Sequence, residues 1–192
     1  MDKIKEFKYK KIKNFLTLSE TNILKDYCRI KHRLNKQLFD TDPEGSGTTN
    51  SDTSIYADPL MESLLINKNS EMEKLTGLSL KPTYALWRMY TKFAELAPHK
   101  DRRACEISAT INVGSDGTDW PIFIDHQLIY LNPGEALVYL GRDLTHWRGE
   151  FTGDWQAQVF LHYVDANGPF ADQWKDKRIK WGSKFINIEG SR

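Results

Sequence analysis

The stretch Leu131-Asn132-Pro133-Gly134-Glu135-Ala136-Leu137-Val138-Tyr139 decides the fold, because it joins a tight turn to an apolar strand shortly before Thr145-His146-Trp147-Arg148. Asn-Pro-Gly is typical of a turn, and the apolar run after it predicts a strand over 136–140. This region therefore favours a sandwich or barrel of short strands. Similar runs, separated by clusters of Gly and Asp, predict further strands at 83–90, 105–113, 120–124, 127–131 and 156–164.

A first helix is expected well before these strands. Thr17-x-x-Glu20 is a capping-box pattern, so the helix should begin after Thr17 or Ser19. Residues at helical spacing then predict one apolar stripe that faces the core. The stripe consists of Leu24, Tyr27, Cys28, Ile30, Lys31 and Leu34. The short basic run at 8–13 precedes this helix and is typical of a solvated edge strand.

A second helix is expected to begin at Asp58, with Pro59 in its first turn, and to continue in a piece that Ser70 caps and Gly77 ends. Between the two helices, residues 40–54 are rich in Asp, Ser, Thr, Gly and Pro, which predicts either a lid or a disordered loop. Helices followed by a run of short strands predict a mainly β (α+β) domain, whose β core is buttressed by N-terminal helices.

Composition limits the class of protein. The chain has 192 residues, 40% of them hydrophobic and 28% charged, which is ordinary for one globular domain. A net charge of +1 gives no reason to expect a nucleic-acid partner. Two cysteines do not make a disulfide framework, and we expect reduced thiols. The charged N-terminus has no apolar segment typical of a signal peptide or membrane span, so a cytoplasmic location is expected.

His99, Asp101 and His146 are the candidate metal ligands. His99 and Asp101 are two residues apart, and alternate residues of an extended segment point to the same side. Two imidazoles and one carboxylate suit Fe(II) and leave other coordination positions open. His99 follows a predicted strand and a short turn, and His146 follows the strand that ends near Tyr139, so both lie where loops leave a sheet. The alternative is two ordinary packed or surface histidines and a solvated aspartate.

Five segments add to this pattern: Ile12–Thr17, Thr83–Tyr90, His99–Arg102, Leu131–Tyr139 and Val159–Tyr163. In order and spacing, from about residue 10 to residue 168, they resemble the Fe(II)- and 2-oxoglutarate-dependent dioxygenases, nearest to the prolyl-4-hydroxylase-like branch. The resemblance implies a double-stranded β-helix (jelly-roll, cupin-like) core at about 82–165. A helical part at about 15–78 precedes this core and a tail at 166–192 follows it, all within one domain, 1–192.

The same resemblance implies Fe(II) on His99, Asp101 and His146, with 2-oxoglutarate as co-substrate and dioxygen as oxidant. The branch normally has a Lys or Arg after the distal histidine to bind the far carboxylate of 2-oxoglutarate. This chain has Gln156 at that point and no Lys or Arg between Gly149 and Trp174.

A different anchor for 2-oxoglutarate is therefore expected. Arg148 shares a strand face with His146 and is the first candidate, while a surface ion pair is its alternative role. Arg88 is the second candidate. Tyr90 and Gln158 are further candidates for hydrogen bonds to the co-substrate, and ordinary core packing is the alternative for Tyr90.

Three residues are candidates for contact with the substrate: Arg102, Trp120 and Trp147, for which solvation or core packing are the alternatives. The expected reaction is hydroxylation of an unactivated C–H bond in a small molecule or peptide, with an amino acid or peptidyl residue favoured. Two other functions remain open, a cupin-like metal-dependent isomerase or lyase and a non-catalytic jelly-roll binding module. The basic, aromatic tail around Gln173–Trp181 either contacts a partner or packs its Trp residues onto the barrel.

Overall fold

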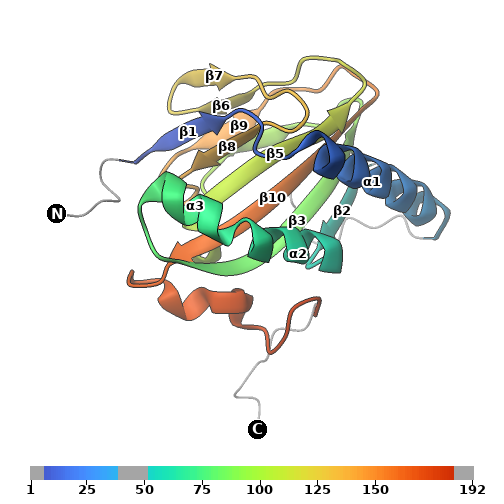
Figure 1. Ribbon diagram of the computed structural model, residues 1–192. Helices are drawn as coiled ribbons and strands as arrows, with labels where there is room; N and C mark the ends of the chain where they lie inside the picture. Colours follow the sequence, from blue (N-terminus) through green and yellow to red (C-terminus); the bar gives the residue numbers. More distant parts are fainter. Residues whose placement is uncertain (1–6, 39–51, 184–192) are drawn as a thin grey trace, which may run out of the picture.

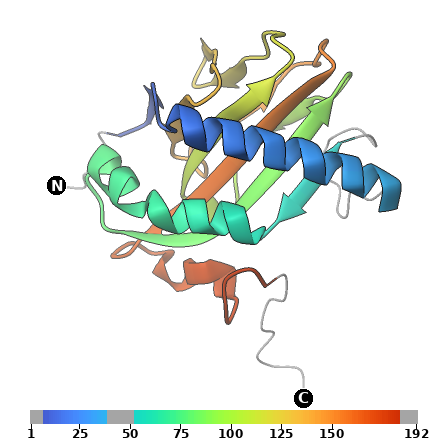
Figure 2. The same cartoon turned by 45° about the vertical axis from the view of Figure 1, so that its right-hand side comes forward.

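The computed structural model describes residues 7–38 and 52–183, and the side chains of 35–38 are left out of the description. Two antiparallel sheets face each other, and the helices cover the outer face of the larger one (Figures 1 and 2). The larger sheet has the strand order β1 (Tyr9–Ile12), β8 (Ala136–Tyr139), β5 (Ile107–Ser115), β10 (Trp155–Asp165), β3 (Leu80–Thr91), β2 (Thr53–Tyr56). The smaller sheet has the order β4 (Leu96–His99), β9 (His146–Arg148), β6 (Ile122–Ile124), β7 (Gln127–Ile129).

The mainly β class and most of the predicted strands are confirmed, and β1 is an edge strand as expected. Three details differ. Cys105 was expected in a strand but ends a 3-10 turn, η2 (Arg103–Cys105), so that β5 starts two residues later. Strands β2 and β4 were not predicted. Strand β4 contains Pro98 and pairs only with β9, across an irregularity, which is where a strand tolerates proline.

Helix α1 (Leu18–Leu38) begins as the capping box predicts. The Thr17 amide donates to Glu20 Oε2 at 2.7 Å, and the Glu20 amide donates to Thr17 Oγ1 at 3.2 Å. The prediction that an apolar stripe faces the core is right only for the first half of the helix, because Ile30 and Leu34 are 58% and 47% exposed. In this half His32, rather than Ile30 or Leu34, faces the sheet, since its Nδ1 lies 2.7 Å from Thr53 Oγ1 on β2.

Helix α2 (Pro59–Asn67) is capped by Asp58, whose Oδ1 accepts from the amide of Leu60 at 3.0 Å. The expectation for helix α3 (Asn69–Thr76) was wrong in one detail, since Lys68 rather than Ser70 is its N-cap. Gly77 ends α3 with φ 72°, a left-handed conformation that glycine adopts without strain. The expected loop at 40–54 falls mostly outside the described residues.

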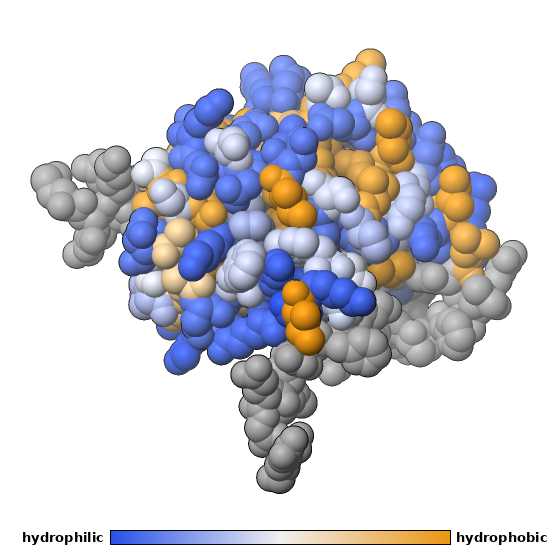
Figure 3. Space-filling view, turned by 60° about the horizontal axis from the view of Figure 1, so that its bottom comes forward, coloured by the Kyte–Doolittle hydropathy of each residue, from blue (hydrophilic) through white to orange (hydrophobic). Residues whose placement is uncertain are grey.

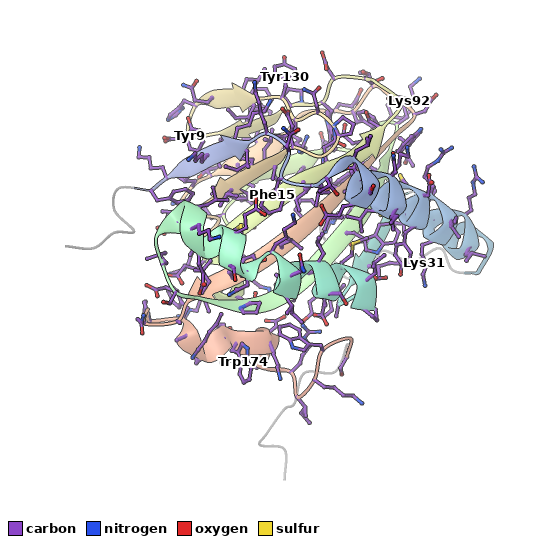
Figure 4. The ribbon with its side chains drawn as sticks, in the orientation of Figure 1. Tyr9, Phe15, Lys31, Lys92, Tyr130 and Trp174 are labelled. Carbon is purple, nitrogen blue, oxygen red and sulfur yellow. The ribbon has the colours of Figure 1, made fainter. Side chains whose placement is uncertain are left out.

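The two faces of the larger sheet differ in chemistry. Alternate residues of β3 and β10, such as Trp87 and Val159, point to the helices and join the main apolar core. The core also includes Phe15, which Figure 4 shows between the helices and the sheet. The other residues of the same strands point toward the smaller sheet. The register there places four side chains in one row across β3, β10, β5 and β8: Tyr84, His162, Ser108 and Tyr139.

The C-terminal segment, which includes the 3-10 element η3 (Ala171–Lys177), packs below β3 and α2 (Figure 1). Its Arg178 guanidinium is buried and pairs with the buried carboxylate of Glu62 on α2. Trp181 packs against the main core, whereas Trp174 is 50% exposed (Figure 4). The expectation that the tail packs its Trp residues onto the barrel therefore holds for one of the two. Figure 3 shows this side of the molecule, where hydrophobic side chains form small, separate spots on a hydrophilic surface.

Candidate metal centre and its cavity

His99, Asp101 and His146 meet between the two sheets. Strands β4 and β9 pair so that His99 lies opposite His146, and the ring centroids are 4.3 Å apart. Asp101 follows β4 and is held by a hydrogen bond from its amide to the carbonyl of Gly141 at 2.9 Å. Each histidine Nε2 lies 3.6 Å from Asp101 Oδ1. The possible ligand atoms of the three residues all lie within 4.8 Å of one another.

The outer nitrogens of both rings are already bonded. His99 Nδ1 lies 2.9 Å from the carbonyl of Ala97, and His146 Nδ1 lies 3.0 Å from the carbonyl of Leu144. A carbonyl only accepts, so each Nδ1 carries the ring proton and each Nε2 presents a lone pair. Two lone pairs and a carboxylate oxygen therefore face one point, an arrangement that a divalent cation stabilises. The donor set fits a metal, and a 2-His-1-carboxylate set fits non-haem iron.

The protonation of the triad favours the same conclusion. The neighbouring Asp101 carboxylate raises the pKa of His99, while burial lowers the pKa of His146. Burial opposes ionisation of Asp101, but the nearby His99, His162 and His146 bring its pKa below the usual value. At neutral pH the group is thus a carboxylate beside a neutral His146, the forms in which both bind metals.

The second oxygen of Asp101 is fixed by neighbours that the sequence did not identify. The Ser108 hydroxyl donates to Asp101 Oδ2 at 3.1 Å and lies 2.9 Å from His162 Nδ1. A Cβ atom at Gly141 would collide with this same Oδ2, so only glycine fits there. Ser108, His162 and Gly141 therefore set the position of the carboxylate, as residues around a metal ligand commonly do.

A cavity of about 280 Å³ opens next to the triad. Tyr139 is a wall that sequence reasoning missed, and its OH lies 3.4 Å from His146 Nε2. Its position could have been found from parity, since it alternates along β8 with Val138, which belongs to the main apolar core on the other face. The cavity brings seven of the ten predicted site residues together: His99, Asp101, His146, Arg88, Tyr90, Arg148 and Arg102. Gln158, Trp120 and Trp147 do not line it.

Arg88 and Arg148 are buried, and among the described residues neither forms an ion pair. Arg148 Nη1 donates to the carbonyl of Trp120, and its guanidinium lies 4.8 Å from the centroid of that indole. Burial lowers the pKa of Arg148 to about 10, so it remains charged at neutral pH. Arg88 Nη1 and Arg148 Nη2 are buried without a hydrogen-bond partner. Two buried charges with unused donors need an anion to be stable.

Two predicted residues support this pair rather than face the cavity. Gln158 lies opposite Arg88 in the β3–β10 register, accepts from Thr110 at 3.2 Å, and has a buried Nε2 without a partner. Trp120 stacks on Arg148 and Tyr90. Trp147 lies elsewhere, because it points away from its strand neighbours His146 and Arg148 and stacks on Phe123 at a centroid distance of 3.7 Å.

Arg102 lies at the rim of the cavity, but its guanidinium has a protein partner. Both Nη atoms donate to the carboxylate of Asp176 in the C-terminal segment, each at 2.6 Å. The Tyr56 hydroxyl donates to the same carboxylate at 2.5 Å. Arg102 also lies over the ring of Tyr84, at 4.4 Å from its centroid. The sequence gave no sign of this contact, because Arg102 and Asp176 are 74 residues apart.

Comparison with known proteins gives the fold. No protein-family profile matches the chain, and no curated protein matches its sequence. Solved structures do match. A Pseudomonas putida prolyl-4-hydroxylase has a TM-score of 0.61 at 17% identity, covering 85% of this chain and 96% of that one. The α-ketoglutarate-dependent epimerase SnoN from nogalamycin biosynthesis has a TM-score of 0.65 at 15% identity, covering 85% and 80%.

A third match is the viral collagen prolyl hydroxylase from Paramecium bursaria Chlorella virus-1, with a TM-score of 0.61 at 10% identity, covering 83% of this chain and 97% of that one. The chain therefore has the fold of the iron- and 2-oxoglutarate-dependent oxygenases, as the sequence resemblance implied. Because these proteins include an epimerase beside hydroxylases, the fold by itself does not choose the reaction. None of the described helices combines the length and apolar character needed to cross a bilayer.

Proposed function

We propose that this protein is an Fe(II)- and 2-oxoglutarate-dependent dioxygenase with a double-stranded β-helix core, which hydroxylates an unactivated C–H bond. One observation carries the proposal. Two imidazole Nε2 atoms and a carboxylate oxygen converge on one point, in a cavity that also holds two buried guanidinium groups for which the described part of the chain offers no anionic partner. A metal that keeps open positions, next to a binding site for a dianion, is what this reaction requires.

Arg148 is our choice for the residue that binds the far carboxylate of 2-oxoglutarate. It is the more deeply buried of the two arginines, and the contacts with Trp120 fix its orientation. Its planar fork can form two parallel hydrogen bonds to a carboxylate. Arg88, whose charge lies close to Tyr90, would supply a second positive charge beside it. Such a pair replaces the basic residue that the family places later in the chain.

When bound, iron and 2-oxoglutarate would supply the activation of dioxygen that C–H cleavage needs. The residues of the chain have other tasks. His99, Asp101 and His146 would hold the metal from one side, and Ser108 keeps Asp101 in a fixed orientation. Arg148 would hold the co-substrate away from solvent, in a site where electrostatic interactions are strong because water is excluded. The open rim at Lys100 and Arg102 is the side from which a substrate would approach.

The substrate that we propose is a small molecule or a peptide, with an amino acid or a peptidyl residue favoured by the likeness to prolyl hydroxylases. A reducing compartment such as the cytoplasm suits the protein, because Cys28 and Cys105 are both free thiols.

The test is a spectroscopic titration without oxygen. Iron-loaded protein should develop a weak visible charge-transfer band when 2-oxoglutarate is added, because the keto acid chelates the metal. His146→Ala should abolish the band together with metal binding. His126→Ala is the matched control, since His126 is an exposed histidine in the turn between β6 and β7 and should leave both unchanged.

Metal analysis of the same samples separates the possible outcomes. Undiminished iron in His146→Ala would overturn the metal assignment. Iron binding without a band in the native protein would exclude 2-oxoglutarate and favour a cupin-like isomerase or lyase. Absence of iron from the native protein would leave a non-catalytic binding module. Release of succinate during screening of substrate pools would then identify the substrate.

A further inference from the structure

A second cluster of ligand-type side chains lies directly beside the first. Asp101, Cys105 and His162 each offer one ligand atom, and these atoms all lie within 4.8 Å of one another. That is the same limit within which the atoms of His99, Asp101 and His146 lie. The second cluster therefore falls within the same distance limit as the candidate iron ligands.

Separate elements position this cluster. Cys105 ends the turn η2, and its Sγ lies 3.0 Å from the hydroxyl of Tyr84. His162 lies on β10, opposite Ser108 on β5 and Tyr84 on β3, and its ring stacks on Tyr84 at 4.4 Å between centroids. Both Cys105 and His162 are buried, yet both line the cavity, so an ion that enters the cavity can reach them.

We propose that Asp101, Cys105 and His162 form a second metal site, which takes Zn²⁺ or a similar borderline-soft ion rather than Fe²⁺. The ligands would be the Cys105 thiolate, a ring nitrogen of His162 and the Asp101 carboxylate, with a fourth position open to the cavity. Zinc accepts Cys sulfur, His nitrogen and Asp oxygen as ligands, and catalytic zinc sites have three protein ligands and one open position. The inference goes beyond the dioxygenase proposal and does not depend on binding of 2-oxoglutarate.

Because their ligands differ, the two clusters should prefer different metal ions. The first has two imidazoles and a carboxylate, whereas the second exchanges one imidazole for a thiol. A thiolate is a soft ligand and favours zinc over harder ions. On binding, the Cys105 S–H bond breaks, its electron pair forms the metal–sulfur bond, and the proton leaves to the buffer; no oxidant or reductant takes part. Tetrahedral zinc needs donor atoms about 3.5 Å apart, so the cluster must contract slightly.

The surroundings permit a cation at this place. Arg102 lies over the ring of Tyr84 beside the cluster, and its charge is balanced by the two hydrogen bonds to Asp176. Asp101 would be shared between the two clusters, since its Oδ1 faces His99 and His146 while its Oδ2 faces Ser108. The single negative charge of Asp101 cannot fully neutralise two dications. Zinc at the second site should therefore weaken metal binding at the first, and iron should weaken zinc binding by the same factor.

Cobalt is the probe, because Co²⁺ replaces zinc and a cysteine thiolate bound to it gives an intense near-ultraviolet charge-transfer band. Co²⁺ added to the reduced native protein should produce this band, and Zn²⁺ should displace it. Cys105→Ser should lose the band. Cys28→Ser is the matched control, because Cys28 is the other buried free cysteine and lies on α1 in the main core; it should retain the band.

Two further variants keep the test decisive. His162→Asn should weaken cobalt binding measured through the band by ~10-fold or more, as loss of a ligand does. His99→Ala removes the first site alone and should leave the band in place. If Cys105→Ser does not fold, the native protein and these two variants still decide. Absence of the band from the native protein, its persistence in Cys105→Ser, or an unchanged affinity in His162→Asn would overturn the proposal.

Discussion

The two faces of the larger sheet use the same strands for opposite purposes. On the face toward the helices, β3 contributes Ala85, Trp87 and Met89 to a close-packed apolar core. On the other face, the intervening residues Arg88 and Tyr90 are polar, and one of them has a buried donor without a partner. The core face stabilises the fold, whereas the cavity face holds polar groups at a cost in stability. Substitutions on the two faces should therefore have separable effects on stability and on binding.

The largest effect on stability is expected from Trp87→Ala. Trp87 is fully buried between α1 and the sheet and contacts Tyr27 edge-to-face at 6.4 Å between centroids. Removal of the indole leaves a cavity in a close-packed core, so the free energy of unfolding should fall by about 3–5 kcal/mol. Denaturant unfolding measures the change. A loss below 1 kcal/mol would mean that this face is not the main source of stability.

Arg148→Ala tests the other face. We expect 2-oxoglutarate to bind about 2–5 kcal/mol more weakly, the usual cost of removing one partner of a buried charge pair. Iron binding and folding should remain, because Arg148 is not a ligand and its burial is itself unfavourable. Calorimetric titration of 2-oxoglutarate measures the change, and Arg88→Ala should give a smaller one. The reverse ranking would make Arg88 the anchor.

Ser108→Ala should change metal affinity but hardly change stability. The variant removes the hydroxyl that orients Asp101, and loss of such a partner commonly weakens metal binding by about 10–100-fold. Competition with a metal chelator measures the affinity. Thr110→Val is the control, because Thr110 is a buried hydroxyl residue on the same strand and face, and its hydroxyl donates to Gln158. Equal losses in both variants would point to a general effect of β5 rather than to Asp101.

The smallest effect is expected at the start of α1. Thr17→Ala removes the side chain that accepts from the Glu20 amide, and such a change costs about 0.5–2 kcal/mol. Thermal unfolding should register the loss, while affinity for iron and 2-oxoglutarate should not change. A parallel loss of metal affinity would show that the helix layer and the cavity are coupled through the sheet.

Sequence patterns predicted those parts of the molecule that follow from local periodicity. The i, i+2 spacing of His99 and Asp101 and the strand parity of Arg148 with His146 both led to residues that do line the cavity. Parity could also have excluded Trp147, which lies between His146 and Arg148 and must point the other way. The pattern of α1 failed in its second half, where Ile30 and Leu34 are exposed and the polar His32 contacts β2 instead.

Contacts between distant segments could not be predicted in this way. Ser108 and Gly141 fix Asp101 only because β5 and the loop after β8 happen to meet there, and neither residue has a distinctive spacing. The pair of Arg102 with Asp176 and the cluster of Cys105 with His162 also depend on which strands become neighbours. The sequence shows which side chains are present, but it does not show which strands pair, and strand pairing creates these contacts.

The position of β10 has a consequence for how the chain is made. This strand is the last of the described strands in the sequence, yet it lies in the middle of the larger sheet, between β5 and β3. Until it is synthesised, β3 and β5 each have an open edge, and the row that contains Ser108 and Tyr84 is incomplete. A nascent chain must therefore carry these edges until β10 has been made, and pairing across such long separations is slow. Emergence of β10 from the ribosome, rather than emergence of the early helices, should set the moment at which the larger sheet closes behind the metal ligands.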